Sequence, residues 1–176
     1  MLPNPLHPAV VHFPIVLMLF LPIVAVVTLW AIRRGANPRR AWAIPFVVAG
    51  LLMLSTWVSV ETGEEQSERV ERAVPKQPME SHEEFAEVFF MLSGAVLVVA
   101  AAGMLNGRIG RASRVLASFG AVGLAAAGVR VGHSGGQLVY THGAASAYTQ
   151  SSATTENVRG ERRQKVKESD GDVRVP

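Results

Sequence analysis

The sequence predicts an all-α polytopic membrane protein, in which four transmembrane helices form an antiparallel bundle followed by a disordered polar tail. Apolar residues make up 49% of the 176 residues, and charged residues only 18%. The apolar residues gather in four long blocks, and a helix needs about 20 such residues to cross a bilayer. The charged residues lie in short stretches between the blocks. This distribution, more than composition alone, indicates the fold class.

The first two blocks predict transmembrane helices over residues 9–32 and 42–60. Arg33 and Arg34 close the first block as a stop-transfer flank does, and the residues before the block lack a basic region. We therefore expect the first helix to be retained, not removed as a signal peptide. A polar loop is expected over residues 61–80, where Glu, Ser and Arg predominate.

The third block predicts a helix over residues 82–105, and the stretch SHEE suggests where it begins. The Ser81 hydroxyl can accept a hydrogen bond from the backbone N–H of Glu84, while the Glu84 carboxylate reaches back to the Ser81 N–H. Such a capping box places His82 and Glu83 in the first turn of the helix.

The fourth block predicts a helix over residues 115–132, rich in Gly and Ala. Its Gly128-x-x-x-Gly132 pattern is typical of helices that pack closely inside a membrane bundle. After Gly132 we expect a turn and a short structured segment. The transmembrane domain is thus predicted over residues 1–145, and a polar, disordered tail over residues 146–176.

Basic residues predict the orientation in the membrane. The two connections on one side of the bundle carry seven arginines and no acidic residue; these are Arg33, Arg34, Arg39, Arg40, Arg108, Arg111 and Arg114. Lys and Arg accumulate on the cytoplasmic side, so we expect a bacterial inner-membrane protein with both termini in the periplasm. Because the basic residues flank the membrane, the net charge of +3 does not indicate nucleic-acid binding.

The absence of cysteine narrows the possible chemistry. It excludes disulfides, Cys-ligated zinc or iron–sulfur clusters, thiol catalysis and covalent attachment of a c-type haem. Motifs for nucleotide binding, serine hydrolysis and zinc proteolysis are also missing, so nothing supports a hydrolase. Any metal or haem must be held by His, Met, carboxylate or backbone groups.

All five histidines of the chain fall on the predicted periplasmic side: His7, His12, His82, His133 and His142. Three chemistries use such a cluster. Imidazoles from different helices can ligate a b-type haem. With Glu61, Glu83 or Glu87 they can bind non-haem zinc, copper or iron. Imidazoles at the membrane surface can also handle protons or quinones.

Position along the chain predicts different roles for some of these side chains. His12 lies about one turn inside an apolar helix, where an unpaired polar group is costly, so we expect it to have a partner. His7 precedes a proline and is expected to be extended, with a structural role or none. Arg130, the only basic residue inside a predicted span, is expected to pair with Glu61 or Glu87, or with a helix C-terminus.

For His82, His133 and His142, the sequence is consistent with either a functional or a structural role. His82 can simply be solvated at the start of its helix. His133 and His142 flank the segment GGQLVYTHG, whose glycines suggest that the backbone passes close to a bulky group.

Four elements of the sequence resemble a bacterial membrane-protein family known as domain of unknown function 2231 (DUF2231). They are LHPAVVHFPIVL, Thr62-Gly63 after the second span, the histidine that opens the third, and GGQLVYTHG after the fourth. The resemblance covers about residues 6–145. It implies four spans, a histidine-bearing outer face and an association with c-type cytochromes or other redox modules. It matches His12, His82 and His142 to motif positions and His7 to the LHP element, whereas His133 is less typical.

The favoured hypothesis is therefore a membrane protein that binds b-type haem at its outer end for electron transfer. The predicted haem ligands are His12 and His82, followed by His142 and His133, and Arg130 would meet the haem propionates. Besides the bilayer, a periplasmic cytochrome or another redox protein is the expected partner. The alternatives are a zinc, copper or iron site at His12, His82 and His142, and a structural subunit of a membrane complex without cofactor.

Overall fold

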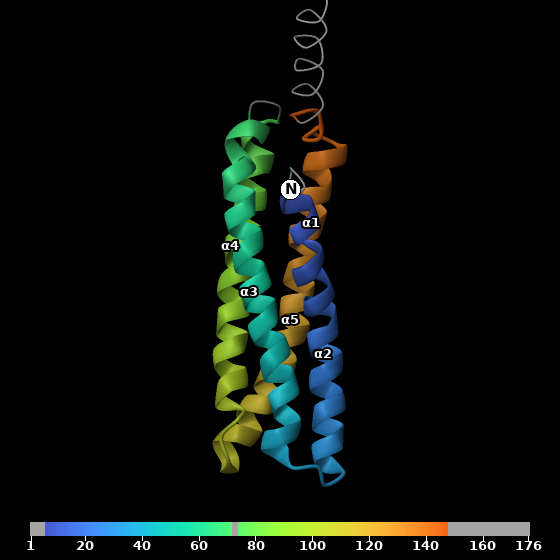
Figure 1. The fold of residues 1–176 in the computed structure, drawn as a ribbon, viewed down its shortest axis with the longest axis vertical. Coiled ribbons are helices and arrows are strands. Elements are labelled where there is room, and N and C mark those ends of the chain that lie inside the picture. The colour runs from blue at the N-terminus through green and yellow to red at the C-terminus, as the bar shows by residue number, and fades with distance from the viewer. Residues whose placement is uncertain (1–5, 72–73, 148–176) are drawn as a thin grey trace, which may run out of the picture.

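The computed structural model describes residues 6–71 and 74–147, and every regular element within these ranges is an α-helix. The short helix α1 (His7–Val10) is separated by Val11 alone from α2 (His12–Arg33), so the two form nearly one rod (Figure 1). Three long helices follow: α3 (Pro38–Val70), α4 (Lys76–Ala102) and α5 (Gly107–Tyr140). The described part of the predicted tail is limited to residues 146 and 147; the rest lies outside the described residues.

The long helices form an antiparallel four-helix bundle (Figure 1). Helix α3 packs between α2 and α4, and α5 packs against α4 and closes the ring against α2. Helix α1 also contacts α3. The beginnings of α1 and α4 and the ends of α3 and α5 thus share one end of the bundle.

All four rods are long and apolar enough to cross a membrane, as predicted. Burial follows the pattern of a protein in lipid. Small side chains such as Ala25, Ala49 and Ala121 lie in the core, while Phe119 and Val98 are about 70% exposed. Small residues at the contacts let helix backbones approach in a bilayer, and the large apolar side chains outside have hydrocarbon as their solvent.

Three helices differ in extent from the predicted spans. Helix α3 runs on to Val70, through ten residues of the predicted loop, and α4 begins at Lys76. The predicted capping box is wrong, because Ser81 lies inside α4 and the N-cap is Pro75. Helix α5 continues past Gly132 to Tyr140, where a turn was predicted. Hydropathy marks where a helix leaves the apolar layer, but Glu, Gln and Arg form helix readily beyond it.

The close-packing prediction for the fourth helix is confirmed at one of its two glycines. Gly128 is buried, and a Cβ atom there would collide with the sulfur of Met18 on α2. Gly132 faces open space, because no atom of the described residues lies within 4 Å of a Cβ atom built there. The contact between α2 and α5 therefore depends on the first glycine of the pair.

Buried polar contacts hold the end of the bundle opposite the histidines. The indole of Trp42, which is fully buried, donates to the carbonyl oxygen of Ala100 at 2.9 Å. Arg114 was expected in a polar turn, but it lies in α5 with 4% of its surface exposed. Its guanidinium donates to the carbonyl oxygens of Gly103 at 2.7 Å and Leu105 at 3.0 Å. These bonds satisfy carbonyl groups left unpaired where α4 ends.

Candidate functional site

The five histidines lie at one end of the bundle, hereafter the histidine end. His7 and His12 begin α1 and α2, and His82 lies near the start of α4. His133 is on the last part of α5, and His142 follows that helix. The antiparallel arrangement brings these helix ends together (Figure 1). The histidine side chains nevertheless differ in their direction and burial.

His7 points into the bundle, toward α3. It is helical and half-buried. The expected extended conformation is therefore wrong, whereas the structural role that was expected as one of two alternatives is not contradicted. Its Nδ1 atom lies 2.9 Å from the carbonyl oxygen of Ser59 and 3.4 Å from the hydroxyl of Thr62. A carbonyl oxygen can only accept, so Nδ1 carries the proton.

His82 points from α4 toward α5 and is also half-buried. Its Nδ1 atom lies 2.9 Å from Oγ of Ser134. The Ser134 hydroxyl donates its single hydrogen to the carbonyl oxygen of Val131, at 2.9 Å. The Ser134 oxygen therefore accepts from His82, and Nδ1 of this histidine is protonated as well.

The same tautomer follows for both imidazoles. With Nδ1–H donating to an oxygen, each neutral ring keeps its lone pair on Nε2. Within residues 6–71 and 74–147, the hydrogen bonds given atom by atom for these two rings are all made at Nδ1, and the imidazole of His82 also interacts with the backbone of Val131. A fixed Nδ1–H with the lone pair on Nε2 is the arrangement of histidines that bind metals.

Each of these two imidazoles packs on a glycine of a neighbouring helix. A Cβ atom at Gly63 on α3 would lie 3.2 Å from Cε1 of His7. A Cβ atom at Gly135 on α5 would lie 3.0 Å from Cε1 of His82. The predicted close approach to a bulky group is therefore found at Gly135, and the group is an imidazole of the protein itself.

The other predicted residues do not join this pair. His12 is exposed and has no partner among the described residues, contrary to the expectation that it needs one. His133 is exposed on α5. Arg130 is exposed too, and instead of pairing with Glu61 or Glu87 its guanidinium lies 5.0 Å from the centroid of the Phe85 ring.

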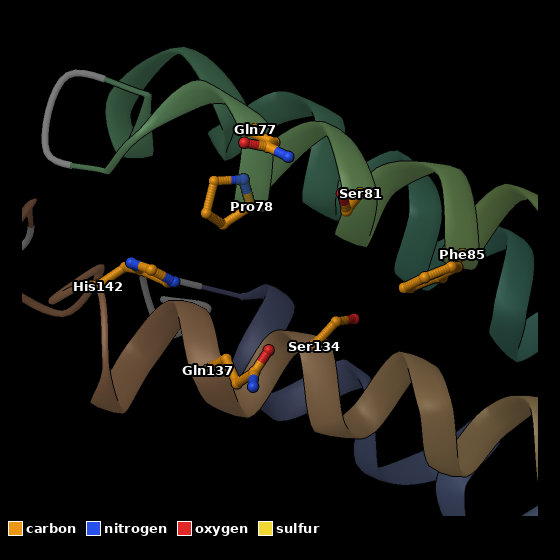
Figure 2. A pocket seen from close by; sticks show the side chains of 7 residues that line it. All are labelled: Gln77, Pro78, Ser81, Phe85, Ser134, Gln137 and His142. Carbon is orange, nitrogen blue, oxygen red and sulfur yellow. The ribbon is translucent and has the colours of Figure 1, made fainter.

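His142 lies at a separate place, the edge of a cavity between α4 and α5. The cavity has a volume of about 230 Å³. Its lining residues come from the start of α4 and the end of α5; they are Gln77, Pro78, Ser81, Phe85, Ser134, Gln137 and His142 (Figure 2). Ser134 connects this cavity to the histidine pair, because its hydroxyl holds Nδ1 of His82.

Within the described ranges, no group of three or more His, Asp or Glu side chains is arranged to hold a metal ion. Glu83, named as a possible metal ligand, is exposed on α4. Two imidazoles, those of His7 and His82, are each held at Nδ1 by an oxygen of a neighbouring helix.

Sequence reasoning did not predict that His7 points into the bundle or which residues hold it. The signal was available in the spacing: His7 and His12 are five residues apart. At 3.6 residues per turn, this separation is about 140° around a helix, so only one of the two can face the interior. The resemblance had marked Thr62 and Gly63, the residues against which His7 lies.

Comparison with family models, with curated proteins and with solved structures finds no match for this chain. The resemblance to DUF2231 stays a prediction.

Proposed function

We propose that this protein spans the bacterial inner membrane and binds b-type haem at its histidine end for electron transfer, and that His7 and His82 would hold the haem. The observation that supports the proposal is that both imidazoles have the same tautomer and the same kind of hydrogen bond. Each donates from Nδ1 to an oxygen of a neighbouring helix, at 2.9 Å in both cases, and keeps its lone pair on Nε2. Partners at Nδ1 fix the orientation of a ligating imidazole and raise its basicity.

The donor set favours haem over the alternatives. A b-type haem needs two axial protein ligands and no cysteine, and the chain has none. Non-haem zinc, copper or iron sites usually take three or four protein ligands. When bound, haem supplies reversible one-electron chemistry. The residues of the chain would orient the two imidazoles and, through the apolar faces of the helices, limit the access of water to them.

This proposal revises the ligands expected from the sequence. His7 takes the place of His12, because His12 is exposed. His142 and His133 are left without an axial role, and Arg130 stays a candidate partner for a haem propionate, since its guanidinium is exposed on the same part of α5. A periplasmic cytochrome or another redox protein remains the proposed electron-transfer partner, and membership of DUF2231 remains a proposal.

Charge supports a periplasmic histidine end. The arginines of the α2–α3 and α4–α5 connections lie at the opposite end of the bundle. Glutamates predominate near the histidines, where Glu64 and Glu65 on α3 and Glu83 and Glu84 on α4 are exposed. Basic connections stay in the cytoplasm. The histidine end and the N-terminus would then lie in the periplasm.

Absorption spectra of the full chain test the proposal. The protein would be produced in haem-replete cells, purified in detergent and measured oxidised and after reduction with dithionite. We expect a sharp Soret band and α band in the wild type, and their loss in His7→Ala and His82→Ala. His12→Ala distinguishes the structural from the sequence-based assignment, because it removes an imidazole of the same segment that points outward.

The other outcomes identify the alternatives. A colourless protein that contains one equivalent of zinc, copper or iron would show that the site binds a non-haem metal and not haem. A protein with neither would indicate a structural subunit. Loss of the bands in His12→Ala, with the bands kept in His7→Ala, would reverse the assignment of ligands. Circular dichroism of each variant shows whether the bundle is still helical.

A further inference from the structure

The cavity between α4 and α5 has the properties of a small-molecule site. Its volume of about 230 Å³ exceeds the about 150 Å³ in which a protein can hold benzene. It therefore has room for one substituted six-membered ring, but not for a porphyrin. It lies at the histidine end, between the first three turns of α4 and the last two turns of α5 (Figure 2).

The lining indicates a ligand that is neutral, flat and able to form hydrogen bonds. Pro78 and Phe85 supply apolar faces from α4. Across the gap, Gln137 and His142 supply groups that can donate or accept hydrogen bonds, and Ser81 adds a hydroxyl (Figure 2). None of the lining side chains is a carboxylate, lysine or arginine. The Arg130 guanidinium lies 5.0 Å from the centroid of the Phe85 ring but does not line the cavity.

The surroundings give such a ligand a route from the bilayer. Below the cavity, the outer surface of α4 exposes Val88, Met91 and Leu92, which are 41–57% accessible. A lipid-soluble molecule that diffuses along this apolar face can present a polar ring to the cavity while its tail stays in hydrocarbon. Quinones of the membrane combine these two properties.

We infer that this cavity binds the ring of a membrane quinol and positions it as electron donor to the His7–His82 site. The inference rests on the proposed function for the identity of the acceptor. Ser134 makes the connection, because it lines the cavity and its hydroxyl accepts from Nδ1 of His82. No other residue that lines the cavity is bonded directly to either histidine of the pair.

The reaction is the two-electron oxidation of a quinol to a quinone. The quinol loses two electrons and two protons. His7 and His82 would hold the one-electron acceptor, which would take the two electrons in turn and pass each to a soluble redox protein. His142 accepts the two protons of the quinol hydroxyls one after the other and releases each to water at the histidine end. The neutral quinone then leaves to the bilayer.

Binding of decylubiquinone to the full chain in detergent micelles tests the site without relying on haem. Equilibrium dialysis should show saturable binding to the wild type. Replacement of a hydrogen-bonding group in Gln137→Leu or His142→Phe should weaken it about tenfold, the equivalent of one hydrogen bond in an apolar site. Tyr140→Phe is the control, because Tyr140 is on the same helix end, is 90% exposed and does not line the cavity.

Reduction by decylubiquinol separates this inference from the proposed function. If dithionite reveals haem in the wild type, decylubiquinol should reduce it, and His142→Phe should slow this reduction while leaving the dithionite spectrum unchanged. Haem that dithionite reduces but decylubiquinol does not would overturn the donor role. Failure to bind decylubiquinone saturably overturns the site, whatever the spectrum. A wild type that binds decylubiquinone but contains no haem would overturn the haem proposal and leave the quinone site standing.

Discussion

The imidazole of His82 lies directly on the backbone of Gly135, where a Cβ atom would approach its Cε1 atom to 3.0 Å. His7 and Gly63 repeat this relationship between α1 and α3, at 3.2 Å. In both cases the helix that carries the glycine also supplies the oxygen that accepts from Nδ1. This oxygen belongs to Ser134 on α5 and to Ser59 on α3. Glycine makes room for the ring, and the nearby oxygen fixes its direction.

Gly135→Ala should disturb the site without weakening the bundle. Alanine in place of glycine within a helix stabilises it by about 0.5–1 kcal/mol, but at position 135 the methyl group presses on His82 and strains its bond to Ser134. We expect haem content to fall while the thermal midpoint in detergent stays at or above the wild-type value. Gly136→Ala is the matched control, because nothing lies within 4 Å of a Cβ atom there. Full haem content in Gly135→Ala would contradict the proposed ligand geometry.

The two glycines of the Gly128-x-x-x-Gly132 pattern should differ in their tolerance of a large side chain. Gly128→Leu would force the side chain onto Met18 and Phe89, and overpacking of a filled core costs about 1–3 kcal/mol. Gly132→Leu adds the same side chain four residues later, where the space is open. Thermal unfolding in micelles should show a lower midpoint for Gly128→Leu alone. Equal midpoints would mean that α2 and α5 are not in the described contact.

Arg114→Ala should destabilise the end of the bundle opposite the histidines. It removes both donors to the carbonyl oxygens of Gly103 and Leu105, and an unsatisfied buried acceptor costs about 1–3 kcal/mol. Arg111→Ala removes an exposed arginine one turn earlier on α5 and should have little effect. Guanidinium chloride or thermal unfolding of both variants measures the difference. A similar loss of stability in both would point to the charge of this end, not to the buried hydrogen bonds, as its cause.

The four spans were predictable because a bilayer imposes both a length and a continuous apolar composition on each helix. The helix ends were not, since nothing in hydropathy distinguishes a polar loop from a polar helical turn. Residues 61–70 illustrate this: they are mostly polar, yet they continue α3. Arg114 escaped detection for a similar reason, because only the structure shows that its guanidinium folds back over the end of α4.

The site was predictable as a cluster but not as a pair. Sequence order and the antiparallel arrangement place the histidines at one end, whereas the choice between His7 and His12 depends on how the first rod is rotated. The contact of α1 with α3 turns His7 inward, and His12 is then exposed. The direction of a side chain around its helix axis is set by packing against the neighbouring helices. A single sequence indicates this packing only weakly, through small residues such as the glycines that face the two imidazoles.

Orientation in the membrane can be tested with reporter fusions. The arginines flanking the α2–α3 turn predict a cytoplasmic turn and a periplasmic C-terminus. Alkaline phosphatase, which is active only after export, should therefore be active when fused after Pro176 and inactive when inserted at Ala36. Fluorescent-protein fusions at the same two positions should give the opposite pattern. Phosphatase activity at Ala36 but not at the C-terminus would invert the orientation and place the histidines in the cytoplasm.

Ser134→Ala and Ser59→Ala should have unequal effects on cofactor binding, although both remove one hydroxyl beside a histidine of the pair. Nδ1 of His82 donates to the side chain of Ser134, whereas Nδ1 of His7 donates to the backbone carbonyl of Ser59. The Ser59 hydroxyl donates instead to the carbonyl oxygen of Ser55. Only Ser134→Ala therefore removes an acceptor that orients an imidazole, and loss of such a partner weakens metal binding by about 10–100-fold.

Haem titration of the two purified apoproteins, followed at the Soret band, measures this difference. Ser134→Ala should bind haem at least about tenfold more weakly, and Ser134→Thr, which keeps a hydroxyl, should recover most of the affinity. Ser59→Ala should bind like the wild type, because its backbone acceptor is retained. If Ser59→Ala loses as much affinity as Ser134→Ala, the hydroxyls act through local helix packing. Orientation of the imidazoles would then not depend on the bonds at Nδ1.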